Sequence, residues 1–285
     1  MASTILEIAQ QVADESGFTI DSAVVGSTDQ TTKQILAIAN RLAREITDAF
    51  AWTHLQKEAQ ITLADGTSTY QLPADINYAF HETVWNRNEE WPIYGPYSPQ
   101  DRQYLRSGII NRYPYQRYTF RGLTNTQFEL DPTPTSTDTG SIVVFEYQSA
   151  RGVRPRTWEQ GQAVAVGDYT FYNGNYYQAS SAGSTGATPP THTSGSVSDG
   201  SVDWDFYDGV YYKFLADTDV PNVDENVFSQ GLLERFSERH GVAVQPRYEV
   251  LLQREAEKQT PGKYVDMLAR PRTRYPNAPG TEWAT

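Results

Sequence analysis

The side chains that could do chemistry are mostly carboxylates, and four of them lie close together in the second half of the chain: Asp199, Asp203, Asp205 and Asp208. They could suggest a calcium site, but they lack the spacing of an EF-hand loop, and a solvated turn is the better interpretation. The histidines show no HExxH spacing and no neighbouring ligand: His54, His81, His192 and His240. No phosphate-binding glycine loop, Gly-x-Ser-x-Gly motif or cysteine is present. We therefore expect a protein that is not an enzyme and holds no metal or cofactor.

An aromatic-rich stretch is the second candidate site. Residues 167–179 alternate aromatic and polar residues on both sides of Asn173-Gly174, a dipeptide typical of a two-residue hairpin turn, and residues 202–206 are expected to add a strand. Its rings could stack on a sugar, contact a fibre or a neighbouring subunit, or fill the core of a module too short to build one from aliphatic residues: Trp158, Tyr172, Tyr176, Tyr177 and Trp204. We favour the core, because the order of residues does not show which rings face water.

The charge of the chain limits its partners. A net charge of -12 argues against a general nucleic-acid binder, because a surface that neutralises phosphates needs an excess of Lys and Arg. A channel wall past which DNA slides would tolerate this charge. Residues 157–208 hold six acidic residues and no Lys or Arg, whereas residues 258–275 hold five basic residues and one acidic residue, a balance of 5 - 1 = +4. This polarity suggests two surfaces with different partners.

Helical patterns occupy the first part of the chain. Thr4 and Glu7 fit a capping box, which precedes apolar residues at helical spacing. A longer amphipathic segment opens at Thr31 or Thr32 and carries one apolar stripe. No apolar run is long enough to span a bilayer, and the N-terminus lacks the pattern of a signal peptide. We therefore expect a protein that is made and kept in a soluble compartment.

The middle of the chain changes to the alternation of strands. Asp65-Gly66 is expected to turn a hairpin. Further strands are expected at residues 81–86, 115–121, 126–130 and 141–148. Residues 98–108 fit a short helix that is capped by Ser98, with Pro99 at the first helical position. This part should form a small antiparallel β region.

Helical signals return late in the chain. Asp224 is a candidate N-cap for a helix that ends near Gly241, and Pro246 is expected to begin another. These late helices have too little to pack on unless they meet the early ones. The fold class is therefore α+β, with an antiparallel helical bundle formed by the N- and C-terminal helices. The Pro-rich residues 261–285 are expected to form an extended C-terminal arm.

Five short motifs follow one another along the chain: FAWTHLQKE from Phe50, YQLPAD from Tyr70, YTFRG from Tyr118, FELDPTP from Phe128 and VFEY from Val144. In this order, and followed by the late helices, they resemble the head-to-tail adaptor proteins of short-tailed phages (podoviruses), also called connectors or tail accessory factors. The resemblance covers about residues 4–156 and 211–260.

The resemblance implies a structural virion protein, made in the host cytoplasm, that forms a homo-oligomeric ring, usually of twelve copies. The ring would lie between the portal protein and the tail nozzle or tail tubular protein. Genomic DNA would pass through its centre without sequence-specific binding. The C-terminal arm would bind the portal through basic and apolar residues: Lys258, Lys263, Tyr264, Leu268, Arg270, Arg272, Arg274 and Tyr275.

The segment of residues 157–208 interrupts this resemblance. It is similar to small β modules that are related in pattern to carbohydrate-binding domains. The expected organisation is a helical body with a β region (1–156), this inserted β module (157–208), the returning helices (209–260) and the arm (261–285). The alternative function is a glycan-binding virion protein that uses the module for adhesion to the host surface. A tail fibre or spike is a further possible partner, and a cell-wall-degrading enzyme has only the carboxylates in its favour.

Overall fold

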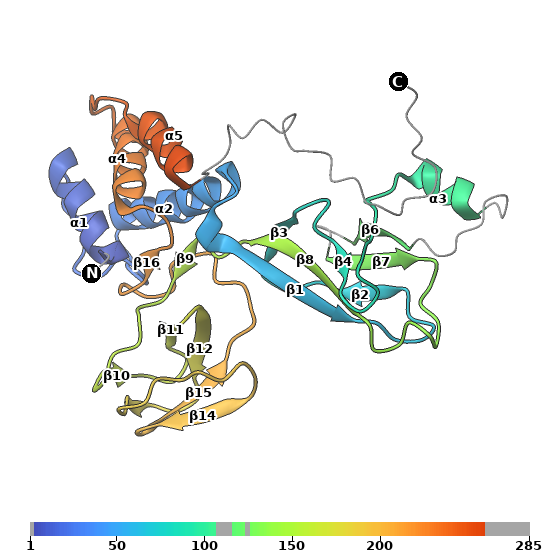
Figure 1. The fold of residues 1–285 in the computed structure, drawn as a ribbon. Coiled ribbons are helices and arrows are strands. Elements are labelled where there is room, and N and C mark those ends of the chain that lie inside the picture. Colours follow the sequence, from blue (N-terminus) through green and yellow to red (C-terminus); the bar gives the residue numbers. More distant parts are fainter. Residues whose placement is uncertain (1–2, 107–115, 123–125, 260–285) are drawn as a thin grey trace.

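A computed structural model describes residues 3–106, 116–122 and 126–259 of the chain. Four helices gather at one end, a long arm of β-strands extends away from them, and a small β module lies below the helices in the view of Figure 1. The combination of helices with antiparallel strands confirms the predicted α+β class. Among the described residues, no helix is both long and apolar enough to cross a membrane.

The helices at this end are α1 (Ile5–Ser16), α2 (Gln30–Ala49), α4 (Glu225–His240) and α5 (Tyr248–Gln259). The capping box of α1 is confirmed, because the Glu7 backbone N–H donates to the Thr4 hydroxyl at 3.3 Å and the Thr4 N–H donates to the Glu7 carboxylate at 2.8 Å. The limits of α4 are also confirmed: Asp224 caps its start, and Gly241 ends it in the left-handed conformation.

Two helix starts differ from the prediction. α2 begins one or two residues before the expected threonines, because the Asp29 carboxylate accepts from the Thr32 backbone N–H at 2.8 Å and acts as the cap. α5 begins at Tyr248, after Pro246, because the Glu234 carboxylate of α4 accepts from the Tyr248 backbone N–H at 2.8 Å. In both places a carboxylate from outside the new helix satisfies its first donors.

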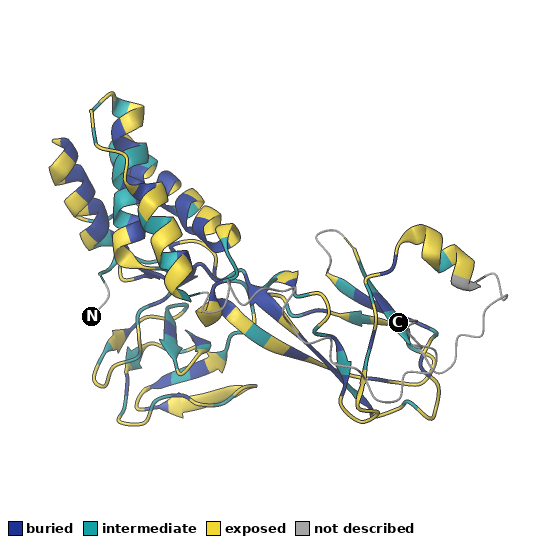
Figure 2. Ribbon diagram, turned by 45° about the horizontal axis from the view of Figure 1, so that its top comes forward, coloured by how far each residue is buried: buried dark blue, intermediate teal, exposed yellow. Residues whose placement is uncertain are grey.

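The apolar faces of the helices share one core. α4 packs against α1, α2 and α5. Figure 2 shows that the helices at this end carry both buried and exposed residues along their length. The largest side chains that these helices bury completely are Phe228, Phe236, Ile5, Ile8, Ile35 and Leu42. At Gly231 in α4 an added Cβ would lie only 2.7 Å from the Tyr248 ring, so this glycine permits the close approach of α4 and α5.

The arm contains two sheets. The larger has the order β1-β8-β4-β5, with β3 also paired to β8: β1 (Gln56–Thr62), β3 (Ile76–Ala79), β4 (Trp85–Asn86), β5 (Trp91–Pro92) and β8 (Ile142–Ser149). The smaller has the order β2-β7-β6: β2 (Thr69–Gln71), β6 (Arg117–Arg121) and β7 (Gln127–Asp131). The predicted short helix is present as α3 (Pro99–Arg106), and the Ser98 hydroxyl accepts from the Asp101 N–H at 3.1 Å. Stacked rings of Phe128 and Phe145 join the two sheets.

The predicted hairpin at Asp65-Gly66 is wrong, although the turn itself is present. The Thr67 N–H donates to the Ala64 carbonyl at 3.1 Å, and Gly66 has a φ of +71°. However, β1 before the turn pairs with β8 over its whole length, and β2 after it pairs with β7. The turn therefore carries the chain from one sheet to the other, because β1 finds a longer partner in β8 than β2 could offer.

The β module contains six short strands: β10 (Ala163–Val164), β11 (Tyr169–Tyr172), β12 (Asn175–Ala179), β13 (Gly183–Ser184), β14 (Ser196–Asp199) and β15 (Val202–Phe206). The predicted hairpin is confirmed, because Tyr172 pairs with Asn175 across Asn173 and Gly174, which have φ values of +49° and +85°. The predicted strand at residues 202–206 is confirmed as β15, which pairs with β12 and β14.

Short strands join the module to the helices. β9 (Val153–Arg154) precedes the module and pairs with β16 (Val220–Pro221), which follows it. Just before β16, the buried Asp219 carboxylate accepts from the Tyr211 hydroxyl at 2.8 Å, and its backbone carbonyl accepts from the Ile5 N–H at 2.8 Å. The return from the module thus also holds the first turn of α1.

Gly152, between β8 and β9, crosses α2 at very close range. An added Cβ would lie 2.2 Å from Thr47 Oγ1 and 2.9 Å from the Ala43 carbonyl oxygen. We expect Gly152→Ala to lower the free energy of unfolding by about 2 kcal/mol, because the helix backbone cannot move away without disturbing the core. Urea unfolding would measure this change.

The control for this prediction is the same substitution in a Thr47→Ala background. The cost should be smaller there, because the nearest atom has been removed, while the contact with the Ala43 carbonyl remains. Equal stability of Gly152→Ala and the unchanged protein would contradict the close approach.

Candidate interaction surfaces

A buried carboxylate lies where the arm meets the helices. Asp75 is 2% exposed, directly precedes β3, and accepts from the Ala150 N–H through its backbone carbonyl at 2.7 Å. Its carboxylate contacts four side chains: Lys57 Nζ at 2.9 Å, the Ser149 hydroxyl at 2.7 Å, the Tyr147 hydroxyl at 2.8 Å and Arg151 Nε at 3.3 Å. These partners come from β1, from β8 and from the residues after β8. We call this group the Asp75 cluster.

Arg151 extends the Asp75 cluster to the module. Its guanidinium lies 4.3 Å from the centre of the Tyr176 ring in β12, and it donates to the Gly209 carbonyl at 2.9 Å. Its backbone carbonyl accepts from the Asn222 side chain at 2.9 Å. Arg151 therefore links the arm to β12 of the module. It also binds Gly209 and Asn222, which lie near the two ends of the segment that leads from the module back to the helices.

The charges in the Asp75 cluster determine the protonation states of the Asp75 carboxyl and the Tyr147 hydroxyl. Burial raises the pKa of Asp75, but the nearby Lys57 and Arg151 more than offset this effect, so the pKa lies below its ordinary value. Burial, with the Asp75 carboxylate, raises the pKa of the Tyr147 hydroxyl, which therefore stays protonated and donates. Asp75 thus stays ionised inside the protein at neutral pH, and its two cations compensate the cost of burying it.

The aromatic stretch of the module serves two cores. Tyr177 and Trp204 are both 0% exposed and pack in the module's own core. Tyr176, the neighbour of Tyr177, is 2% exposed and belongs to the core of the helices, where Tyr169 and Phe171 also pack. Alternate residues of one hairpin therefore face opposite sides, as the period of a strand requires. The hairpin forms a wall that the module shares with the helices.

The five rings do not form one stacking platform. Tyr176, Tyr177 and Trp204 are buried in two different cores, so they have no ring face open to a sugar. Trp158 and Tyr172 are partly exposed and meet edge to face at 5.9 Å between ring centres. A contact with a glycan or a fibre, which the sequence left open, would therefore fall on these two residues.

The acidic residues near the end of the module do not act together. Asp199 is 3% exposed and accepts from the Trp158 indole N–H at 2.7 Å, whereas Asp203 binds the Ser198 hydroxyl. Asp205 and Asp208 are exposed. Within the part of the chain that the structure describes, no group of three or more His, Asp or Glu side chains is placed to hold a metal ion. Asp199 thus positions an aromatic ring.

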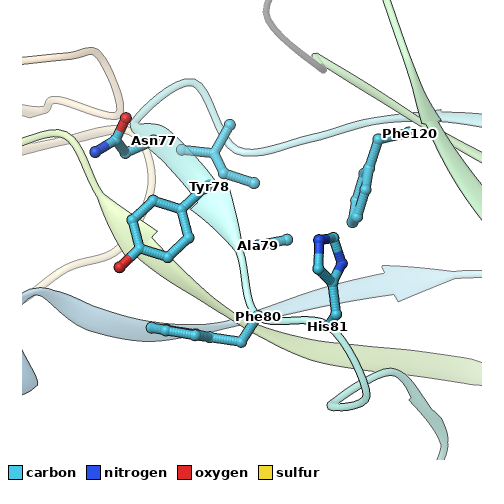
Figure 3. A pocket seen from close by; sticks show the side chains of 7 residues that line it. Asn77, Tyr78, Ala79, Phe80, His81 and Phe120 are labelled. Atoms are coloured by element: carbon cyan, nitrogen blue, oxygen red, sulfur yellow. The ribbon is translucent and has the colours of Figure 1, made fainter. Parts of the chain in front are cut away.

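A small apolar groove opens on the arm beside the Asp75 cluster. It has a volume of about 260 Å³ and lies between β3 and the Phe120 side chain of β6, as Figure 3 shows. The other lining residues are Ile76, Asn77, Tyr78, Ala79, Phe80 and His81. At one rim the Asp48 carboxylate, from the end of α2, accepts from the Asn77 amide at 2.7 Å. Sequence patterns missed this groove because its walls come from two different sheets.

Of the predicted portal contacts, only Lys258 lies within the described residues. It is exposed on α5 and forms an ion pair with Glu255 at 2.8 Å. The other predicted contacts lie outside the described residues: Lys263, Tyr264, Leu268, Arg270, Arg272, Arg274 and Tyr275. The role of the arm therefore stays a prediction.

The charge of Asp75 should determine part of the stability of the protein. In Asp75→Asn, Lys57 and Arg151 lose their common counter-charge, and we expect a loss of about 3 kcal/mol in the free energy of unfolding at neutral pH. Because the folded pKa of Asp75 is lowered, the unchanged protein has this stability above the ordinary pKa of 3.8 and loses it as the pH falls below that value. The two proteins should therefore converge in acid.

Urea unfolding at several pH values would measure this convergence. Asp65→Asn is the matched control, because Asp65 lies exposed in the turn before β2 and its substitution should change little at any pH. A difference between Asp75→Asn and the unchanged protein that stayed constant from neutral to acid pH would contradict the role of the charge.

The module rings should differ in their contribution to stability. We expect Trp204→Ala to lower the free energy of unfolding by about 3 to 5 kcal/mol, because it leaves a large cavity in the module core. Tyr172→Ala should cost much less, because its ring is partly exposed. Thermal or urea unfolding of the two variants would compare them, and equal effects would argue against the burial of Trp204.

Comparison with known proteins agrees with the resemblance that the motifs carry. A family model described as SU10 adaptor protein matches residues 3–243, which include the helices α1, α2 and α4, both sheets of the arm and the β module. A search of curated proteins found no match. Because the family model covers most of the chain, this protein belongs to the SU10 adaptor protein family.

Proposed function

We propose that this phage adaptor protein forms a homo-oligomeric ring of twelve copies between the portal and the tail nozzle of a short-tailed phage. The family match over residues 3–243 carries the proposal. The net charge of -12 is compatible with a ring through which genomic DNA passes, because an acidic wall repels phosphates and does not hold them. The ring would act by assembling on the portal and by letting DNA pass through its centre, and neither process needs a chemical step.

A ring requires subunits that keep one shape. Each copy must offer two different surfaces at a fixed angle, because a small error in the angle opens a ring into a helix. The Asp75 cluster supports this requirement, since it joins the arm to the module through Lys57, Arg151 and Tyr176. The module, held to the helices by its own hairpin, is proposed to brace a neighbouring subunit or a tail fibre.

The C-terminal arm is proposed to bind the portal. Residues 258–275 carry five basic side chains against one acidic side chain, and apolar residues lie between them. A segment of this composition gains affinity by ordering on a partner, and each copy in a ring adds the same contact. The proposal predicts that the purified chain stays monomeric or loosely associated until the portal is present.

The test is to mix the purified chain with the portal protein and measure the mass of the complex. We expect a complex with a fixed number of copies, and we expect none when residues 261–285 are deleted. A triple variant, Arg270→Glu, Arg272→Glu and Arg274→Glu, should also fail to bind, because it reverses the charge of the arm without shortening it.

Lys213→Glu is the matched control, because Lys213 is exposed but lies outside the arm. It should form the complex as well as the unchanged chain does. A complex that forms equally well without the arm would contradict the portal contact, and the absence of any complex would contradict the adaptor ring itself.

A further inference from the structure

The groove beside β3 is open in the chain as described, and its lining is apolar. Its lining includes the rings of Tyr78, Phe80 and Phe120, and its volume of about 260 Å³ suits one or two side chains better than a cofactor. Phe120 lies beside His81, whereas Tyr78 and Phe80 lie on the other side of β3 in the view of Figure 3. Tyr78 is 38% exposed, and its ring meets that of Phe80 edge to face at 5.4 Å. Such a groove is a place for apolar side chains of an extended segment.

The charge around the groove favours a basic occupant. Residues 76–86, which include β3, hold one acidic residue, the exposed Glu82, and no Lys or Arg. The exposed Asp48 carboxylate adds a further negative charge at the rim, where it binds Asn77. An occupant should therefore combine apolar side chains with positive charge.

The chain itself carries such a segment. Residues 260–275, TPGKYVDMLARPRTRY, contain Tyr264, Val265, Met267 and Leu268 together with four basic residues and one acidic residue, a balance of 4 - 1 = +3. Its four basic residues are Lys263, Arg270, Arg272 and Arg274. The chemistry that the groove requires is therefore present immediately after α5.

The described part of the chain also ends near the groove. The side chain of Gln259, the last residue of α5, lies 3.1 Å from His54 Nδ1, and β1 begins two residues after this histidine. The first residue of β1 and Tyr78 of β3 are both paired with Gln148, on opposite sides of β8. Two strand spacings, about 10 Å, therefore separate them. Leu268 follows Gln259 by nine residues, which span up to about 30 Å.

We propose that residues 260–275 bind in the groove between β3 and Phe120 of their own chain, with Tyr264 and Leu268 as apolar anchors. The contact requires no other protein. In the assembly proposed above, it would keep the arm on its own body until the portal competes for the same side chains. The groove is thus an intramolecular docking site for a segment that later binds elsewhere.

The absence of cysteine from the chain gives a direct test. In the full-length variant His81→Cys with Ala269→Cys, one thiol lies at the groove and the other lies beside an anchor that stays intact. We expect an intrachain disulfide to form under mild oxidation, and Leu268→Ala in this background to slow its formation about tenfold, because one anchor is lost. Thr273→Ala is the matched control and should leave the rate unchanged.

The result that overturns the proposal is equally specific. A rate that Leu268→Ala does not change would show that the tether alone brings the thiols together. A mixture of the two single-cysteine variants can form this disulfide only between chains, and its formation there as fast as in the double variant would show that the segment binds another copy. Because no portal is present, the outcome is independent of whether the chain assembles on one.

Discussion

The burial of one carboxylate constrains the whole molecule. Asp75 is 2% exposed, and a charge in that position is tolerated only if counter-charges and hydrogen-bond donors surround it. Those partners are Lys57 of β1, Tyr147 and Ser149 of β8, and Arg151 beyond it. These contacts hold the start of β3 against β1 and β8 at the base of the arm.

The same constraint joins the module to the rest of the chain. Arg151 binds Asp75 on one side and covers the Tyr176 ring on the other, so the position of the arm and the position of the module depend on one guanidinium. Gly152 follows directly and passes within contact of α2. The arm, the module and α2 thus meet at two consecutive residues, Arg151 and Gly152.

Helix caps and turns could be predicted from the sequence, whereas strand pairing and contacts between distant parts of the chain could not. The caps at Thr4 and Asp224 and the Asn173-Gly174 turn were predicted correctly, because neighbours in the chain satisfy these groups. The turn at Asp65-Gly66 could also be predicted, but the partners of its strands could not, because the residues of β1 pair with residues of β8 that follow them by 80 (142 - 62) to 92 (148 - 56) positions. The burial of Asp75 was not predicted, since its partners Tyr147 and Ser149 lie more than seventy residues further along the chain. The groove between β3 and Phe120 was not predicted either, because Phe120 also lies far in the sequence from the other lining residues.

The hairpin that serves two cores has a consequence for how the chain finds its register. Tyr176 and Tyr177 are adjacent, and each fills a space of different shape, one against the helices and one inside the module. A slip of one residue between β11 and β12 would turn each side chain of β12 to the opposite face, so that Tyr176 would face the module and Tyr177 would face the helices. In a sheet with one buried face such a slip would disturb the packing of one core. Here it would disturb two cores, so the packing of both the helices and the module favours the correct pairing of this strand.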